Sequence, residues 1–205
     1  MKNSSNLVDL GFAQTNLPAG THICQIYSDD DERNDSLLSY LVSGLKAGEC
    51  SACFSENITE ETLEEHFSKN DLSFSDLKEA GTFSLSKTED VYFQEGKFDP
   101  EVMLNLLSQY YKNSVAKGYA GARVIGEMSP EIENIEGGSR LCEYESRVSI
   151  LLREHPVTAV CQYHAEEFDG ATIMEVLKVH PMMIVRGSVV HNPFYIPPEE
   201  YLGQG

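Results

Sequence analysis

Short apolar runs alternate along the chain with longer segments in which apolar residues recur every three or four positions. A short apolar run between turn residues is typical of a buried strand, and the longer repeat is typical of a helix with one buried face. The runs predict strands over residues 22–27, 50–54, 82–86, 122–127, 157–163 and 182–186. The repeats predict helices over residues 29–48, 59–67, 73–80, 99–118, 139–152 and 170–179.

The predicted strands are apolar on both faces, and they alternate with helices along the whole chain. This combination is typical of a parallel sheet that helices cover on both sides. We therefore expect an α/β fold with three layers and a doubly wound, mostly parallel sheet, in one domain over residues 1–205. Residues 1–17 would form an N-terminal extension, and residues 192–205, with three prolines, would form an extended C-terminal segment.

The charge of the chain excludes some partners. Acids outnumber bases 33 to 15, a net charge of −18, and residues 28–101 hold 19 acids against 6 bases, a net −13. Nucleic-acid binding requires a basic surface, and an anionic membrane also attracts basic residues. We expect no direct contact with nucleic acid or membrane, and a partner that is neutral, cationic or a protein.

The chain lacks an apolar run near the ~20 residues of a membrane span, and its N-terminal residues lack the apolar core of a signal peptide. This predicts a cytoplasmic protein. Five cysteines, an odd number, are spread through a chain that is 41% hydrophobic, so we expect buried thiols rather than a disulfide framework.

The turn after the first predicted strand is the usual place for a ligand in an open parallel sheet. A nucleotide phosphate there would require glycines and a lysine. Residues 27–33 read Tyr-Ser-Asp-Asp-Asp-Glu-Arg, with four consecutive acids, no glycine and no lysine. Like charge would repel a triphosphate, so we expect no ATPase activity at this turn.

Several segments, in this order and spacing, resemble one family. They are HICQIY (22–27), GLKAGE (44–49), GKFDP (96–100), GYAGARVIGEMS (118–129), EYESRV (143–148), CQYHAEEF (161–168), HP (180–181) and NPFYIPPEEYL (192–202). The chain resembles the MEDS domain, a sensory domain of methanogens and methylotrophs named partly after the DcmR regulator. It also looks like a KaiC/RecA-type domain, that is, a P-loop NTPase-like fold, whose phosphate loop has been lost.

The resemblance implies a non-catalytic sensor of a small hydrocarbon derivative, in one-carbon or methanogenic metabolism, that signals to a regulator or kinase. It implies no cofactor, and it leaves self-association open because KaiC relatives assemble through subunit contacts. Two alternatives remain open at this point. One is an enzyme that uses Glu127 for acid–base chemistry on a small substrate, and the other is a pure protein-interaction module.

The candidate ligand site follows from a RecA-like strand order, 5-1-4-3-2. With residues 82–86 counted as the third strand, this order places the first strand between the strands that end at Glu127 and Tyr163. Side chains at the carboxyl ends of these strands would then converge, and the aromatic rings would suit a small apolar pocket. The expected ligand residues are Tyr27, Ser28, Ser55, Glu56, Glu127, Tyr163 and His164. Four of them also have a structural interpretation: Glu127 as a paired carboxylate, Tyr27 and Tyr163 as core tyrosines, and His164 as a surface histidine.

The cysteines and histidines leave a metal or redox role undecided. His22 and Cys24 alternate on one strand and face the same side, and Cys161 lies on a presumed neighbour, so a His/Cys metal site and ordinary buried thiols are both open. Cys50 and Cys53 form a C-x-x-C, but a second such pair is missing, and residues three apart on a strand face opposite sides. We expect no metal ligand among them.

Overall fold

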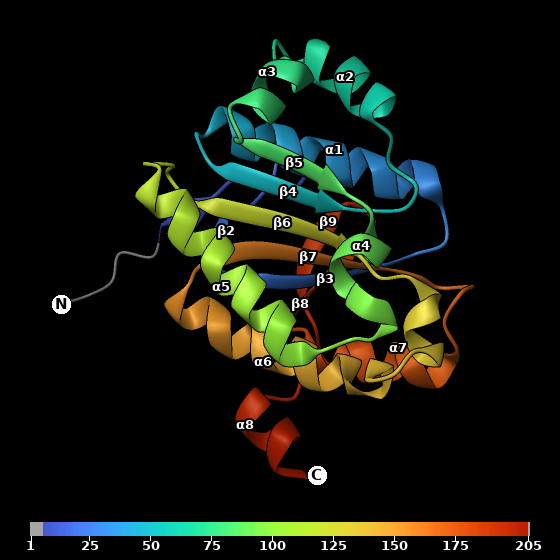
Figure 1. The fold of residues 1–205 in the computed structure, drawn as a ribbon. Helices are drawn as coiled ribbons and strands as arrows, with labels where there is room; N and C mark the ends of the chain where they lie inside the picture. Colours follow the sequence, from blue (N-terminus) through green and yellow to red (C-terminus); the bar gives the residue numbers. More distant parts are fainter. Residues whose placement is uncertain (1–5, 205) are drawn as a thin grey trace, which may run out of the picture.

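A seven-stranded sheet forms the centre of the molecule in a computed structural model that describes residues 6–204 (Figure 1). Neighbouring strands are parallel except for the final β8–β9 hairpin. From one edge to the other, the strands are β5 (Phe83–Ser86), β4 (Cys50–Phe54), β6 (Ala122–Glu127), β7 (Val157–His164), β3 (His22–Tyr27), β8 (Met182–Val185) and β9 (Ser188–His191). The α/β fold with a mostly parallel sheet is confirmed.

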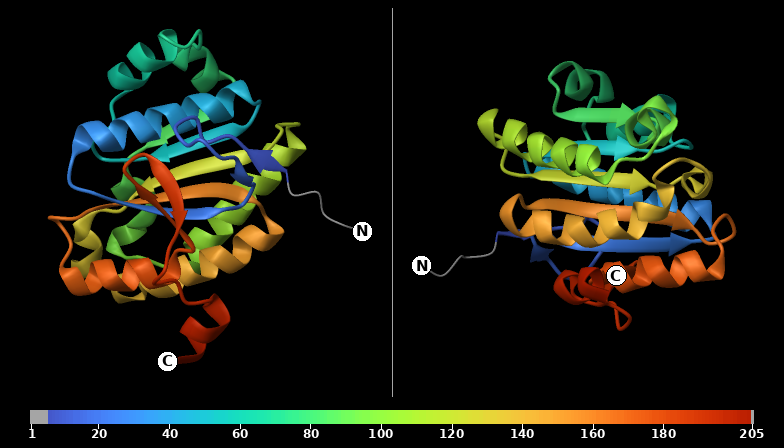
Figure 2. Two further views of the ribbon diagram at one scale, coloured as in Figure 1. Left: turned by 180° about the vertical axis from the view of Figure 1, so that it is seen from behind. Right: turned by 60° about the horizontal axis from the view of Figure 1, so that its bottom comes forward.

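Helices lie on both sides of this sheet, which gives the three layers expected from the sequence (Figure 2). The first side carries α1 (Asp30–Lys46), α2 (Glu60–Ser68) and α3 (Phe74–Glu79). The second side carries α4 (Thr88–Tyr92), α5 (Pro100–Ala116), α6 (Leu141–Glu154) and α7 (Gly170–Val179). We call these the α1 face and the α5 face of the sheet.

Side-chain alternation along each strand builds one apolar core on each face. On β6, Ile125 packs in the core with Leu41 of α1, whereas its neighbour Val124 packs in the core with Leu104 of α5 and Val148 of α6. Both strand residues are nearly inaccessible to solvent. The continuous apolar runs in the sequence are therefore explained by two covered faces rather than one.

The predicted helices and strands are all present, and their ends differ from the predicted ends by no more than two residues. The helix starts have the expected physical cause. The side chain of Thr59 accepts a hydrogen bond from the Thr62 amide, and the side chain of Asp99 accepts one from Glu101 ahead of Pro100 at the first helical position.

The predicted position of the first strand is wrong. The sequence analysis placed it between the strands ending at Glu127 and Tyr163, but β7 separates β3 from β6, and β8 lies on the other side of β3. The cause is β5, an additional edge strand that pairs only with β4. Without β5, the order β8-β3-β7-β6-β4 is the RecA-like order 5-1-4-3-2.

Segments at both ends of the described chain pack onto this framework. Strands β1 (Leu7–Val8) and β2 (Leu17–Pro18) form a small hairpin, and Leu10 between them is fully buried. At the other end, residues 198–204 are helical rather than extended: α8 (Pro198–Tyr201) runs into a 3-10 turn. The 3-10 turns span Gln94–Gly96, Pro130–Asn134, Gly138–Arg140 and Leu202–Gln204.

None of the helices within residues 6–204 combines the length and apolar character that crossing a bilayer requires.

Candidate functional site

The carboxylate of Glu127, at the carboxyl end of β6, is the centre of a buried polar cluster on the α1 face. Its Oε1 accepts hydrogen bonds from the Tyr27 hydroxyl at 2.7 Å, from Arg33 Nη1 at 2.6 Å and from Asn57 Nδ2 at 2.9 Å. Its Oε2 accepts one from the Ser55 hydroxyl. We call these five residues the Glu127 cluster.

The negative charge of Glu127 is balanced within the cluster. Burial alone would raise the pKa of Glu127, but the Ser55 hydrogen bond, the Arg33 charge and the other donors together hold this pKa below its usual value. Burial and the bond to Glu127 raise the pKa of the Tyr27 hydroxyl. Arg33 is 1% exposed, and Asp30 lies 3.3 Å from its Nε atom. A charged carboxylate thus faces a charged guanidinium, and the hydroxyls remain neutral.

Three of the predicted ligand residues, Tyr27, Ser55 and Glu127, meet in this cluster. Three others lie at its rim. Ser28 is exposed after β3, the ring of His164 packs edge-on against Tyr27 at 5.0 Å, and Glu56 accepts a hydrogen bond from the Glu89 amide at the start of α4.

Tyr163 does not join this cluster, because it faces the other side of the sheet. Gln162 pairs with Glu127 in the strand register and shares its face, so the next residue of β7 points the opposite way. The Tyr163 hydroxyl instead donates a 2.6 Å hydrogen bond to Glu145 of α6 on the α5 face.

Two members of the cluster, Arg33 and Asn57, were not predicted from the sequence. Arg33 lies in the first turns of α1, directly after the acidic run, and nothing in the sequence distinguishes it from an exposed arginine that pairs with a neighbouring acid. Asn57 lies in the loop after β4, and nothing in its sequence context distinguishes it from other loop residues.

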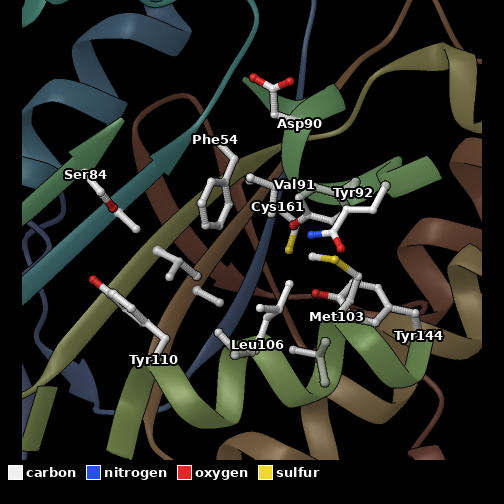
Figure 3. A pocket seen from close by; sticks show the side chains of 17 residues that line it. Phe54, Ser84, Asp90, Val91, Tyr92, Met103, Leu106, Tyr110, Tyr144 and Cys161 are labelled. Atoms are coloured by element: carbon white, nitrogen blue, oxygen red, sulfur yellow. The ribbon is translucent and has the colours of Figure 1, made fainter. Parts of the chain in front are cut away.

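An apolar pocket of about 300 Å³ lies on the opposite, α5 face (Figure 3). Figure 3 shows Met103 and Leu106 of α5 pointing toward Phe54 of β4 and Cys161 of β7 across the cavity. None of the predicted ligand residues lines it.

Aromatic side chains close one end of this pocket. The ring centroids of Phe54 and Tyr92 are 6.1 Å apart, and those of Tyr92 and Tyr144 are 6.3 Å apart, both with edge-on geometry. Gly126 lies in the floor, where a methyl group would approach the Tyr92 hydroxyl to 2.7 Å. Among the described lining residues, Asp90 is the one charged side chain, and it points away from the cavity (Figure 3).

The five cysteines have different surroundings. All are free thiols, and those of Cys24, Cys53 and Cys161 have their pKa raised by burial, so they are protonated at neutral pH. Cys53 packs in the core of the α1 face, and the Cys50 thiol donates to the Gly81 carbonyl, so the C-x-x-C pair does not share a site. Cys161 lies beside His22, Glu145 and His180 in the core of the α5 face.

Comparison with known families identifies the domain type. The family described as "MEDS: MEthanogen/methylotroph, DcmR Sensory domain" matches residues 21–181, from the residue before β3 to the residue before β8. The chain belongs to the MEDS family. The matched range contains both the Glu127 cluster and the apolar pocket, so both are parts of a sensory domain. A search of curated proteins finds no match.

Solved structures support the fold of this MEDS domain. The flagellar accessory protein FlaH from Methanocaldococcus jannaschii superposes with a TM-score of 0.63 at 11% identity, over 87% of this chain and 78% of FlaH. A KaiC-like protein from the archaeon Pyrococcus horikoshii superposes with a TM-score of 0.56 at 14% identity, over 87% of this chain and 79% of that one. The RecA-like fold expected from the resemblance is confirmed.

Proposed function

We propose that this MEDS domain is a non-catalytic sensor that binds a small, neutral, apolar organic molecule in the pocket on the α5 face and signals to a protein partner, a regulator or a kinase. The observation that carries the proposal is the pocket itself. It is preformed, and aliphatic and aromatic side chains such as Phe54, Met103, Leu106 and Val124 dominate its wall. Cavities of this kind are the usual sites for small molecules in globular proteins.

The size and polarity of the pocket define the ligand class. Its volume of about 300 Å³ is roughly twice the ~150 Å³ of an engineered apolar cavity that holds benzene. A compact hydrocarbon derivative therefore fits, and a nucleotide does not. The chain carries a net charge of −18, and Asp90 lies at the pocket, so an anionic ligand would be repelled.

The chemistry of the buried groups supports binding without catalysis. A general base needs a free lone pair near the substrate, whereas the four donors of the Glu127 cluster occupy the carboxylate of Glu127. We therefore expect no turnover and no ATP hydrolysis.

Helix α4 offers a route from the pocket to the surface. Its residues Val91 and Tyr92 line the pocket, and its first residue, Thr88, donates a 2.7 Å hydrogen bond to the Glu127 carbonyl. Its Glu89 amide donates to Glu56 at 2.9 Å. A ligand that packs against Tyr92 would thus restrain a short helix that is attached to the carboxyl edge of the sheet. A partner that contacts α4 at this edge could respond to the change.

Thermal unfolding with small neutral probes tests the proposal. Toluene and cyclohexanol at ten times their dissociation constants should stabilise the protein by about 1.4 kcal/mol, which corresponds to a rise in Tm of roughly 3–6 °C for a chain of this size. Benzoate, which has a similar ring but carries a negative charge, should give no rise at the same concentration.

Two matched variants on α5 locate the binding. Leu106 lines the pocket and is 42% exposed, whereas Val115 is 49% exposed on the same helix and does not line it. Leu106→Gln should weaken toluene binding by about tenfold, a loss of about 1.4 kcal/mol, and Val115→Gln should leave it unchanged. Equal effects of the two substitutions, or no stabilisation by either neutral probe, would contradict the proposal.

A further inference from the structure

Four metal-ligating side chains from four different segments meet in the core of the α5 face. They are His22 at the start of β3, Glu145 of α6, Cys161 of β7 and His180 between α7 and β8. One donor atom of each lies within 4.8 Å of the donor atoms of the others. We call this group the His–Cys–Glu cluster.

Four of the six separations between the donor atoms are close to those of a coordination shell. His22 Nε2 lies 3.4 Å from Cys161 Sγ and 3.2 Å from Glu145 Oε2, and Glu145 Oε2 lies 3.6 Å from both Cys161 Sγ and His180 Nε2. In a tetrahedral zinc site, bonds of about 2.0–2.3 Å place neighbouring ligand atoms about 3.3–3.7 Å apart. Three of these four separations lie within that range, and the fourth, between His22 Nε2 and Glu145 Oε2, is 0.1 Å below it.

The outer nitrogens of both imidazoles are already occupied. His180 Nδ1 donates to the Val176 carbonyl at 2.8 Å, so its Nε2 carries the free lone pair. His22 Nδ1 lies 2.9 Å from the Ser149 hydroxyl, which itself contacts the Val179 carbonyl at 3.5 Å. An outer hydrogen bond that fixes the ring and directs Nε2 inward is the arrangement found around metal-bound histidines.

One atom of the cluster has no hydrogen-bond partner. His180 Nε2 is fully buried and forms no hydrogen bond, although it points at the cluster. A lone pair buried without a donor is costly, because the water it leaves is not replaced. A metal ion bound at this nitrogen would remove that cost.

The charge of Glu145 also favours a cation. The side chain of Glu145 is 1% exposed, and its ion pairs in the described part of the chain are with His22 and His180, which are charged only if protonated. A buried carboxylate without a permanent cationic partner is unfavourable. The Tyr163 hydroxyl, at 2.6 Å from Oε1, satisfies one oxygen and leaves Oε2 directed at the cluster.

We propose that the His–Cys–Glu cluster is a binding site for one divalent transition-metal ion of the zinc class, held in a tetrahedral shell by two imidazoles, one thiolate and one carboxylate. Mixed nitrogen, sulfur and oxygen donors suit zinc better than magnesium or calcium, which prefer oxygen alone. Binding replaces the thiol proton of Cys161, which passes to the solvent. Because Cys161 also lines the apolar pocket, a metal thiolate would then form part of the pocket wall.

Cobalt provides a direct spectroscopic test on the full chain. After removal of metal with a chelator, the protein should bind one equivalent of Co²⁺, with a thiolate-to-cobalt charge-transfer band and the intense visible bands of tetrahedral Co²⁺. One equivalent of Zn²⁺ should then displace the Co²⁺ and abolish the bands.

Substitutions distinguish metal binding at this cluster from metal binding at the acidic surface. Cys161→Ser should abolish the charge-transfer band, and His180→Gln should weaken Co²⁺ binding by more than about tenfold. Cys53→Ala removes a buried strand cysteine on the other face, and His66→Gln removes a histidine of α2, so both should behave like the wild type. X-ray absorption of the zinc-loaded wild type, with one sulfur and at least two imidazoles in the first shell, gives the same answer if a variant fails to fold.

Clear results would overturn the proposal. These are the absence of saturable Co²⁺ and Zn²⁺ binding by the wild type, an oxygen-only first shell, or binding that Cys161→Ser and His180→Gln leave unchanged. Each would mean that the four side chains form a hydrogen-bonded core without metal. Toluene binding at the pocket could still occur in that case, so the two proposals can fail separately.

Discussion

Replacement of Glu127 by glutamine tests whether the Glu127 cluster is structural or takes part in ligand chemistry. The substitution keeps the size of the side chain but removes its charge and replaces one acceptor oxygen with a donor group. Four donors, from Tyr27, Arg33, Ser55 and Asn57, now converge on that carboxylate. In Glu127→Gln they would face one oxygen and one NH₂ group, and Arg33 would lose its buried counter-charge.

The expected cost follows from the burial of the pair. Breaking a buried ion pair costs about 3–5 kcal/mol, because the remaining charge is left in a poorly solvated place. Arg33 is 1% exposed, but the exposed Asp30, 3.3 Å from its Nε, still offsets part of its charge. We therefore expect the low end, about 3 kcal/mol, which is a large share of the ~5–15 kcal/mol that stabilise a typical domain.

Urea unfolding at neutral pH, followed by circular dichroism, measures this cost. A matched control is Glu101→Gln, because Glu101 also pairs with an arginine, Arg147, but on the surface, where such pairs contribute about 0–1 kcal/mol. The double variant Glu127→Gln/Arg33→Met removes both buried charges and should be at least as stable as Glu127→Gln alone.

Toluene affinity should be the same in Glu127→Gln and wild type, because Glu127 does not line the pocket. The structural interpretation is refuted if Glu127→Gln loses less than about 1 kcal/mol of stability while toluene binding disappears. That result would assign Glu127 to the ligand, as the sequence analysis considered.

A change of pH, a substitution and a nucleotide titration give three further tests. The pKa of Glu127 is lower in the folded chain than in an unfolded one, so the charge of Glu127 stabilises the fold above about pH 4.3. This contribution is lost as the pH falls through the folded pKa. The urea midpoints of wild type and Glu127→Gln should therefore converge on acidification. Gly126→Ala would place a methyl group 2.7 Å from the Tyr92 hydroxyl, so Tyr92 must shift; because both residues line the pocket, toluene affinity measured by calorimetry should fall by about tenfold or more. MgATP should produce no heat of binding in calorimetry, and micromolar affinity would refute the interpretation of the acidic first turn.

The sequence predicts the elements of this fold well because their causes are local. Helix ends follow from caps such as Thr59 and Asp99, and strands follow from short apolar runs between turn residues. The strand order could not be derived in the same way. An edge strand such as β5 has the same local pattern as an inner strand. Because it was counted as an inner strand, the predicted place of the first strand in the sheet is one position away from its actual place.

The candidate site was also predicted only in part. Tyr27 and Glu127 meet as expected because the carboxyl ends of parallel strands share an edge, whereas Tyr163 faces away because side chains alternate. The apolar pocket could not be predicted, since its walls come from strands and helices far apart in the sequence. A signal for Glu145 was present: an acid four residues after Leu141, on the apolar face of its helix.

The position of a bound hydrocarbon tests the central proposal most directly. With methyl-labelled protein, toluene at saturation should give nuclear Overhauser contacts to the methyl groups of Leu106, Leu107 and Val124, which line the pocket. It should give none to Ile125, which lies on the other face of the same strand. Contacts to Ile125 without any to the three pocket residues, or no saturable binding up to the solubility limit of toluene, would contradict a sensor whose ligand lies in this pocket.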